Sequence, residues 1–155
     1  MSIISRALVR GLSVFDGWRH RAREKSDAPH LVLARRGEDI AHRFAQLELG
    51  WRVLSRNFRD PGRHAEIDLV ALDGDTLVIA EVKTRSNADE SHPLRAVDTA
   101  KMRRIGHGAR LWLEKAEQMK LSVRFDVLTV VLAEGDQYRV EYFRDAFFPA
   151  ARPGV

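Results

Sequence analysis

The segment that most constrains the fold of this 155-residue chain is a predicted β-hairpin in its middle. Two β-prone runs, 65–72 and 76–83, flank an Asp73-Gly74 turn, which is a strong hairpin signal. The second run is apolar on both faces before its last three residues, as is typical of a strand buried in a sheet. Those last residues are Glu81-Val82-Lys83, thirteen residues after Asp68. The sheet must therefore satisfy charged groups at the end of a buried strand.

Two registers are open for this hairpin. A four-residue loop pairs Leu72 with Leu77 and brings Asp68 opposite Glu81. A two-residue loop brings Glu66 opposite Glu81 and makes Asp68 its diagonal neighbour. Because side chains alternate along a strand, both registers put the two carboxylates on one face. Facing carboxylates repel unless a cation lies between them, so either register predicts a cation site.

The remaining elements place this hairpin in an α/β sandwich with a mixed central sheet. Apolar residues at helical spacing predict helices over 35–49, with Gly50 as a C-cap, and over 93–118. β-Branched and aromatic runs predict further strands over 51–58, 122–133 and 137–143. The predicted order is α-β-β-β-α-β-β. Within the predicted strand 122–133, Asp126 is interpreted as a buried partner of Arg124 or a cap.

Residues 1–29 form a basic amphipathic extension before the main domain, 30–155. Apolar residues at helical spacing and a following basic run predict a helix there, and 26–29 reads as the linker. Such a helix could bind a membrane surface or nucleic acid. The alternative, which we favour, is that it packs on the domain or is a loosely ordered leader.

Composition narrows the classes of function. Lys and Arg number 26 against 22 for Asp and Glu, and the net charge of +4 permits a polyanionic partner. The absence of cysteine excludes disulfides, zinc–thiolate sites and cysteine nucleophiles, and fits a reducing cytoplasm. No apolar run approaches the ~18–20 residues of a membrane helix, and Arg6 and Arg10 interrupt the only candidate signal peptide. We therefore expect a cytoplasmic protein with no membrane partner.

Metal-assisted phosphodiester hydrolysis is the chemistry that needs these residue types. Asp68, Glu81 and the carbonyl of Val82 would bind Mg²⁺ or Mn²⁺, which prefer oxygen ligands. Lys83 would orient or deprotonate the attacking water or neutralise the scissile phosphate, and Glu38, in the first predicted helix, would reach the metal through water. A structural Glu81–Lys83 ion pair is the alternative, but it leaves Asp68 unexplained. Phosphate contacts are expected from Arg85, Lys101, Arg103 and Arg104.

The residues named above resemble the sequence patterns of two groups of known proteins. Asp68 with Glu81-Val82-Lys83 resembles the Asp…(Asp/Glu)-X-Lys signature of the restriction-endonuclease-like superfamily, whose core order is α-β-β-β-α-β. Over about residues 34–148 the chain also resembles the YraN-like family of bacterial predicted endonucleases. Six blocks carry that match in order: Gly37-Glu38-Asp39-Ile40-Ala41, Asn57, Glu66-Ile67-Asp68-Leu69, Glu81-Val82-Lys83-Thr84-Arg85, Lys101 and Arg124-Phe125-Asp126-Val127.

The resemblance implies a nuclease fold of the Holliday-junction-resolvase type, with Glu38, Asp68, Glu81 and Lys83 as active-site candidates. It implies branched or structured DNA as substrate, in preference to RNA, and fold analogy suggests a homodimer. The alternative is a non-catalytic accessory protein that binds nucleic acid on the same fold. The chain departs from the family pattern at Ala65, where glycine is usual, and in 88–95, which lacks an expected glycine.

Overall fold

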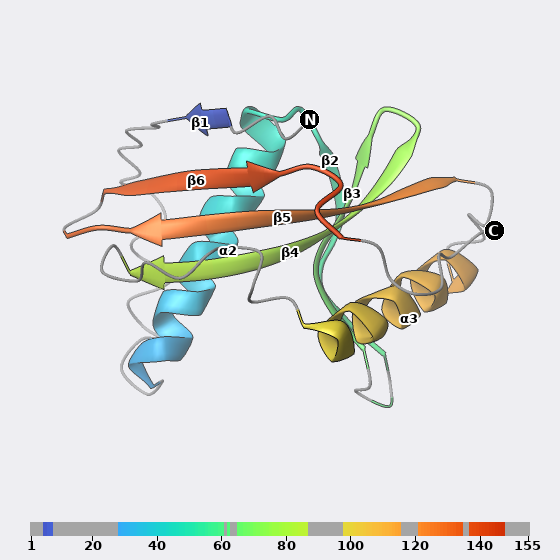
Figure 1. The fold of residues 1–155 in the computed structure, drawn as a ribbon. Coiled ribbons are helices and arrows are strands. Elements are labelled where there is room, and N and C mark those ends of the chain that lie inside the picture. Colours follow the sequence, from blue (N-terminus) through green and yellow to red (C-terminus); the bar gives the residue numbers. More distant parts are fainter. Residues whose placement is uncertain are drawn as a thin grey trace.

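The computed structural model describes residues 5–7, 28–60, 62, 65–86, 98–115, 121–134 and 137–147 (Figure 1). These residues form two helices and six strands. In chain order they are β1 (Ser5–Ala7), α2 (Pro29–Leu47), β2 (Arg52–Arg59), β3 (Glu66–Asp73), β4 (Thr76–Ser86), α3 (Thr99–Lys115), β5 (Ser122–Leu132) and β6 (Tyr138–Phe143). From α2 onward the order is the predicted α-β-β-β-α-β-β.

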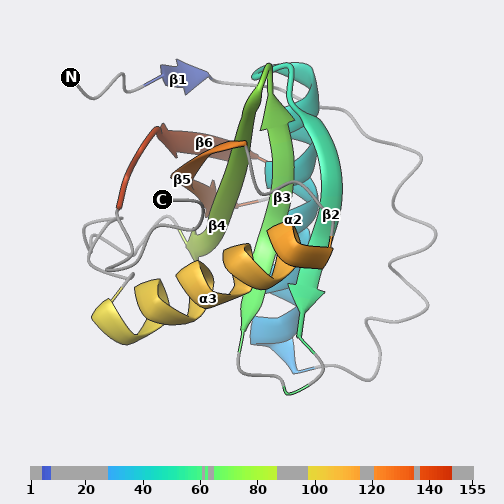
Figure 2. The same ribbon diagram turned by 90° about the vertical axis from the view of Figure 1, so that its right-hand side faces the viewer.

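A single sheet forms the middle layer, with strand order β1-β6-β5-β4-β3-β2. β4 and β5 run parallel, joined by the crossover through α3, and the other neighbours are antiparallel. Helix α2 lies on one face of the sheet and α3 on the other (Figures 1 and 2). The mixed sheet and two-sided helix cover confirm the predicted α/β class, consistent with a restriction-endonuclease-like core.

Each helix seals a separate hydrophobic cluster. On one face, Phe44 of α2 packs with alternate β4 residues such as Ala80. On the other face, Ile105 of α3 packs with the intervening residues, such as Ile79. β4 is thus buried from both sides, as its continuous apolar run predicts. Any charged residue on this strand must find partners inside the protein.

The start of α2 corrects the sequence prediction. The helix begins at Pro29 rather than Arg35, so Pro29 belongs to the helix and not to a linker. Proline suits the first position of a helix because its missing N–H has no intrahelical role there. At the other end the C-cap is Glu48, whereas Gly50 follows with a left-handed φ of +68°.

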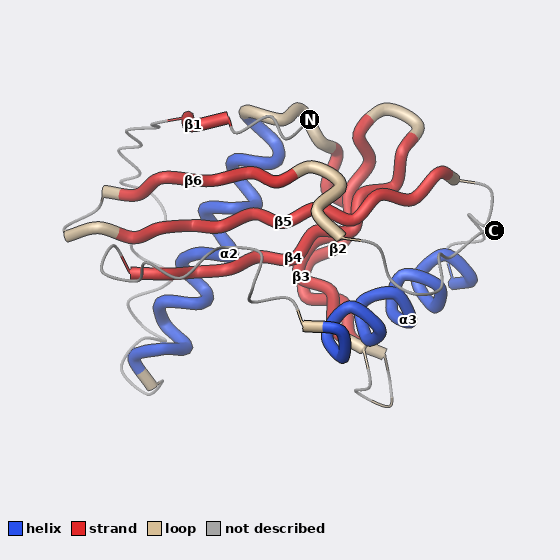
Figure 3. Tube along the Cα trace, viewed as in Figure 1, coloured by secondary structure: helices blue, strands red, loops and turns tan. Residues whose placement is uncertain are grey.

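The extension also differs from its prediction where it is described. Ser5–Ala7 forms a short strand against β6, where a helix was predicted. The rest of that predicted helix lies outside the described residues, as do the ends, 93–97 and 116–118, of the predicted second helix. Figure 3 shows β1 at the edge of the sheet beside β6. Neither described helix combines the length and apolar character needed to cross a membrane.

Candidate active site

The β3–β4 hairpin brings the two predicted acidic residues together. Leu72 pairs with Leu77, and the backbone pairing continues to Leu69 and Ala80. The pairing ends there, one residue before Asp68 and Glu81, and these two acids are close enough for the charge of Glu81 to act on Asp68. This confirms the register that pairs Leu72 with Leu77 and rules out the alternative with Glu66 opposite Glu81. The loop itself is shorter than the four residues predicted, because Asp73 pairs with Thr76 and only Gly74 and Asp75 form the turn.

Asp68 stands where the backbone ladder between β3 and β4 ends. Its Oδ2 accepts a hydrogen bond from the Val82 N–H at 2.7 Å, so the side chain takes the place of a strand partner. This bond holds the carboxyl group against the backbone of β4. Burial, and next the charge of Glu81, raise the pKa of Asp68 from 3.8 to about 7, and Glu38 contributes in the same direction. Asp68 therefore sits in an electrostatically unfavourable position unless a cation joins it.

Glu81 is the most deeply buried member of the site, with 2% of its side chain exposed. Its Oε1 pairs with Lys83 Nζ at 2.7 Å and with Lys101 Nζ at 3.1 Å. Its Oε2 is buried and has no hydrogen-bond partner among the residues that the structure describes. A buried polar atom without a partner costs about 1–3 kcal/mol, and more when it is charged. The Glu81–Lys83 pair considered from sequence exists, but it satisfies only one of the two carboxylate oxygens.

Lys101 reaches Glu81 because α3 is fixed against β3. Asp98 Oδ1 accepts the Lys101 N–H at 2.7 Å and so caps the first turn of α3. Further along the helix, Gly108 approaches β3 so closely that an added Cβ would lie 3.2 Å from the Ile67 Cδ1. The sequence placed Lys101 among phosphate contacts, and the structure places its ammonium group on Glu81. Only the docking of α3, which is a long-range feature, reveals this contact.

Glu38 enters from α2, on the other side of the sheet from α3. Its Oε2 accepts a hydrogen bond from Asn57 Nδ2 on β2 at 3.0 Å. Sequence reasoning assigned no role to Asn57, although an asparagine within a β-prone run is a signal, because asparagine is depleted in strands. Glu38 also borders a cleft of about 220 Å³, which is lined by His30, Leu33, Ala34, Glu38, Val82 and Thr84.

The predicted phosphate contacts are distributed unequally. Arg103 and Arg104 are exposed on α3, whereas Arg85 is buried on β4. No group of three or more acidic or histidine side chains close enough to cage a metal occurs in the described ranges. A cation at this site would therefore depend on Asp68, Glu81 and backbone or solvent oxygens. Magnesium sites often use only one or two protein carboxylates, so this ligand set suits it.

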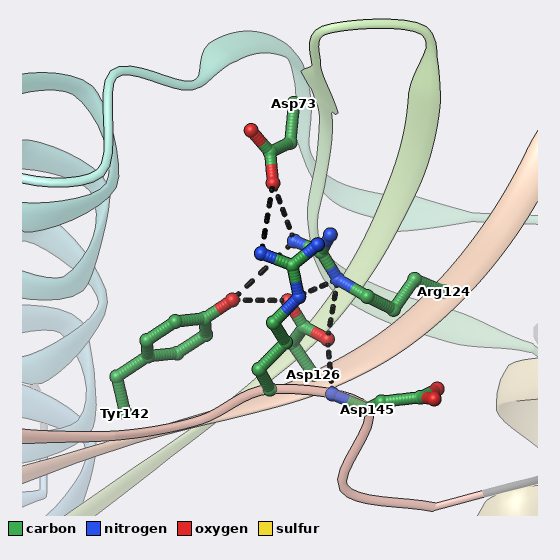
Figure 4. A network of polar contacts seen from close by, with 6 residues as sticks. Asp73, Arg124, Asp126, Tyr142 and Asp145 are labelled. Atoms are coloured by element: carbon green, nitrogen blue, oxygen red, sulfur yellow. Dashed lines mark hydrogen bonds and ion pairs between the residues drawn. The ribbon is translucent and has the colours of Figure 1, made fainter. Parts of the chain in front are cut away.

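A second buried acid, Asp126, shows how a purely structural carboxylate is satisfied here (Figure 4). Arg124 Nε donates to both of its oxygens at 3.0 Å, Tyr142 donates to Oδ2 at 2.8 Å, and the Asp145 N–H donates to Oδ1 at 2.8 Å. Arg124 also pairs with Asp73 at 2.9 Å. The predicted Asp126–Arg124 pair is confirmed. Asp126 therefore has a hydrogen-bond partner for each oxygen, whereas Glu81 has none for its Oε2 among the described residues.

Comparison with known proteins agrees with the resemblance drawn from the residues. The uncharacterised protein family UPF0102 matches residues 37–130, a span that contains Glu38, Asp68, Glu81, Lys83 and Lys101. A UPF0102 protein of Rhodococcus opacus (strain B4) is 41% identical over 120 residues, which cover 77% of this chain and 99% of that protein. A second, from Geobacter sulfurreducens, is 40% identical over 116 residues, covering 75% and 88% of the two chains.

A third relative extends the similarity to another bacterium. The UPF0102 protein of Bacteroides thetaiotaomicron is 38% identical over 122 residues, which cover 79% of this chain and 97% of that protein. These relatives span most of their own lengths in the match, so the similarity is not confined to one motif. The YraN-like resemblance is confirmed: this chain belongs to the UPF0102 family.

Proposed function

We propose that this protein is a metal-dependent nuclease that hydrolyses phosphodiester bonds in branched or otherwise structured DNA. The observation that carries the proposal is the state of the two facing acids. Glu81 keeps a buried oxygen without a partner among the described residues, and Asp68 has its pKa raised to about 7 by burial and by Glu81. Both features are unfavourable in the protein alone. Perturbed acids of this kind are typical of functional sites.

The residues fit a hard divalent cation such as Mg²⁺ or Mn²⁺. The unpartnered Glu81 Oε2 and the Asp68 carboxylate are oxygen donors of the type that these ions prefer, and Val82, whose carbonyl is the third expected ligand, follows Glu81 on β4. When bound, the cation would supply positive charge that activates the attacking water and offsets the charge that builds up on the phosphate. Asp68 and Glu81 would hold that charge in place.

Lys83 has the position for a direct role in the reaction. Its ammonium group lies 2.7 Å from Glu81 Oε1, and 24% of its side chain is exposed, so it can contact both the buried acid and a substrate. Lys83 would orient the attacking water or donate a hydrogen bond to the scissile phosphate. Lys101, at the same oxygen, is equally exposed and would help to neutralise the phosphate.

The choice of nucleic acid as substrate depends on charge and on family resemblance. The chain carries a net charge of +4, and Arg103 and Arg104 are exposed on the helix that supplies Lys101. Contacts of this kind bind the phosphate backbone without reading sequence. The preference for branched DNA comes from the resemblance to resolvase-type nucleases.

A second candidate function is an accessory protein that binds nucleic acid without cutting it. One observation favours it: Lys83 and Lys101 already neutralise Glu81 from within the protein. In such a protein the acid–lysine cluster would stabilise the fold, and exposed arginines would bind phosphates. Cleavage assays separate the two functions.

The decisive experiment incubates labelled single-stranded, flapped and four-way DNA, with matched RNA, in Mg²⁺ or Mn²⁺. We expect metal-dependent cleavage that Asp68→Asn and Glu81→Gln abolish, since both changes keep side-chain shape and remove the charge that holds the cation. Asp75→Asn, an exposed change in the turn of the same hairpin, is the matched control and should cut normally. Lys83→Ala should retain Mn²⁺ binding and lose about 100-fold or more in kcat.

The outcomes distinguish the candidates. Undiminished cleavage by both acid variants would reject the proposed site. Binding of the DNA panel without cleavage by the parent chain would support the accessory function instead. A fitted salt slope for binding would count the phosphates contacted in either case.

A further inference from the structure

Asn57 has an unusual backbone at a position next to the candidate site. Its φ is +49°, in the left-handed region, although it lies within strand β2. The pairs Arg56–Leu69 and Phe58–Ile67 place Asn57 opposite Asp68 on the neighbouring strand. A left-handed residue other than glycine costs about 1 kcal/mol or more, and such strain concentrates at functional sites. Asparagine is among the side chains that tolerate this conformation best.

The strained residue makes one specific contact. Asn57 Nδ2 donates to Glu38 Oε2 at 3.0 Å, joining the edge strand β2 to helix α2. Both side chains are accessible to water, so this bond alone adds little to stability. Stability therefore does not explain why the chain keeps a strained backbone here.

Neighbouring contacts fix the same turn of α2 on both sides. Arg56, the residue before Asn57, pairs with Asp39, the residue after Glu38. Gly37 packs so tightly on β4 that an added Cβ would lie 1.8 Å from Thr84 Oγ1. Three consecutive helix residues are thus held between β2 and β4, with Asp68 on the strand between them. The charge of Glu38 is close enough to act on Asp68.

We propose that Asn57 is a positioning residue that aims the Glu38 carboxylate at the cation site formed by Asp68 and Glu81. The inference rests on the proposed nuclease function and adds a residue to its site. Asn57 engages Oε2 of Glu38, and Oε1 can then accept a hydrogen bond from a water in the site. Asn57 thus combines a left-handed backbone with a side-chain hydrogen bond to α2.

Four variants of the full chain separate positioning from packing. Asn57→Gly keeps the left-handed backbone without strain and removes the donor. Asn57→Asp replaces the donor with a carboxylate that repels Glu38. The double variant E38Q/N57D reverses donor and acceptor. Asp39→Asn is the matched control, because it removes the neighbouring ion pair between the same helix and strand and leaves the Asn57–Glu38 pair intact.

Three readouts are measured for each variant: the melting temperature in EDTA, the affinity for Mn²⁺ by titration calorimetry, and kcat and KM on a four-way DNA junction. Asn57→Gly should lose about 10–100-fold in Mn²⁺ affinity or kcat, the range typical of residues that orient metal ligands, with little change in melting temperature. Asn57→Asp should lose more and melt earlier. E38Q/N57D should regain the melting temperature lost in Asn57→Asp and leave kcat low. Asp39→Asn should lower the melting temperature and spare Mn²⁺ affinity.

If the parent chain binds Mn²⁺ and cuts DNA, and Asn57→Gly matches it in both, the positioning role of Asn57 is rejected and the nuclease function stands. That positioning role is also rejected if Asp39→Asn loses as much Mn²⁺ affinity as Asn57→Gly, because Asn57 would then only dock the helix. A parent chain that neither binds Mn²⁺ nor cuts any substrate would overturn the nuclease function and this role together. The measurements on the parent chain therefore tell the two failures apart.

Discussion

Replacing Asp68 by asparagine should make the metal-free protein more stable. The Asp68 carboxyl has a pKa raised from 3.8 to about 7, first by burial and then by the charge of Glu81. Ionising it in the folded protein is therefore costly. The amide oxygen of asparagine can still accept the Val82 N–H bond, which spans 2.7 Å in the parent chain. The variant thus keeps the shape and the backbone contact and loses only the charge.

The size and pH range of the effect follow from the two pKa values. Between pH 3.8 and about 7 the folded protein keeps a proton on Asp68 that the unfolded chain has released. Stability therefore falls as the pH rises through this range and stays low above it. A rise of about 3 in pKa corresponds to about 4 kcal/mol at most, since one pKa unit is worth about 1.4 kcal/mol. For a chain of this length that is roughly 10 °C in melting temperature.

Thermal unfolding in EDTA at several values between pH 4 and pH 8 measures the effect. Asp68→Asn should melt like the parent near pH 4 and well above it at pH 8. Excess Mg²⁺ or Mn²⁺ should narrow the gap at pH 8, because a bound cation favours the ionised carboxylate of the parent. Asp75→Asn, exposed in the hairpin turn, is the control for removing a negative charge. If Asp68→Asn and the parent melt together at pH 8 in EDTA, the electrostatic account of the site is wrong.

Two further changes test the packing around the site. Gly37→Ala should lower the free energy of unfolding by about 1–3 kcal/mol, because its Cβ would lie 1.8 Å from Thr84 Oγ1 and would push α2 off β4. Urea unfolding measures this loss, and an unchanged midpoint would contradict the close packing. Tyr142→Phe should cost about 1–3 kcal/mol in the same assay, since it removes the hydroxyl that donates to Asp126 and accepts from Arg124. A stability equal to that of the parent would show that this hydroxyl is dispensable to the network.

Local sequence patterns were enough to predict that Asp68 and Glu81 lie together in the candidate active site. The facing of Asp68 and Glu81 depends only on the alternation of side chains and on a hairpin register, which neighbouring residues determine. The Arg124–Asp126 pair is likewise local, because residues two apart on a strand share a face. The order of helices and strands followed from the period of the apolar residues for the same reason.

Features that depend on distant contacts could not be predicted. Lys101 pairs with Glu81 only because α3 docks on β3, and no pattern within the helix specifies that contact. Gly37 lies within the helix predicted over 35–49, but its close contact with Thr84, which leaves no room for a side chain, depends on how α2 docks on β4. The left-handed Asn57 opposite Asp68 depends on how β2 pairs with β3. In each case the contact is determined by the packing of elements that are distant in sequence.

The ion pairs of Glu81 raise the question of why a cation would bind a cluster that is already neutral by count. Lys83 and Lys101 offset the two acids in sum, but both ammonium groups gather at Oε1 of Glu81. Because hydrogen bonds act only at the atoms they join, the two lysines leave the buried Oε2 without a hydrogen-bond partner among the described residues. The pKa of Asp68 is also still raised to about 7. The lysines hold Glu81 in place while leaving its second oxygen and Asp68 with an unmet need for positive charge. A small divalent cation can meet that need from a single position, and a long lysine side chain already committed to Oε1 cannot.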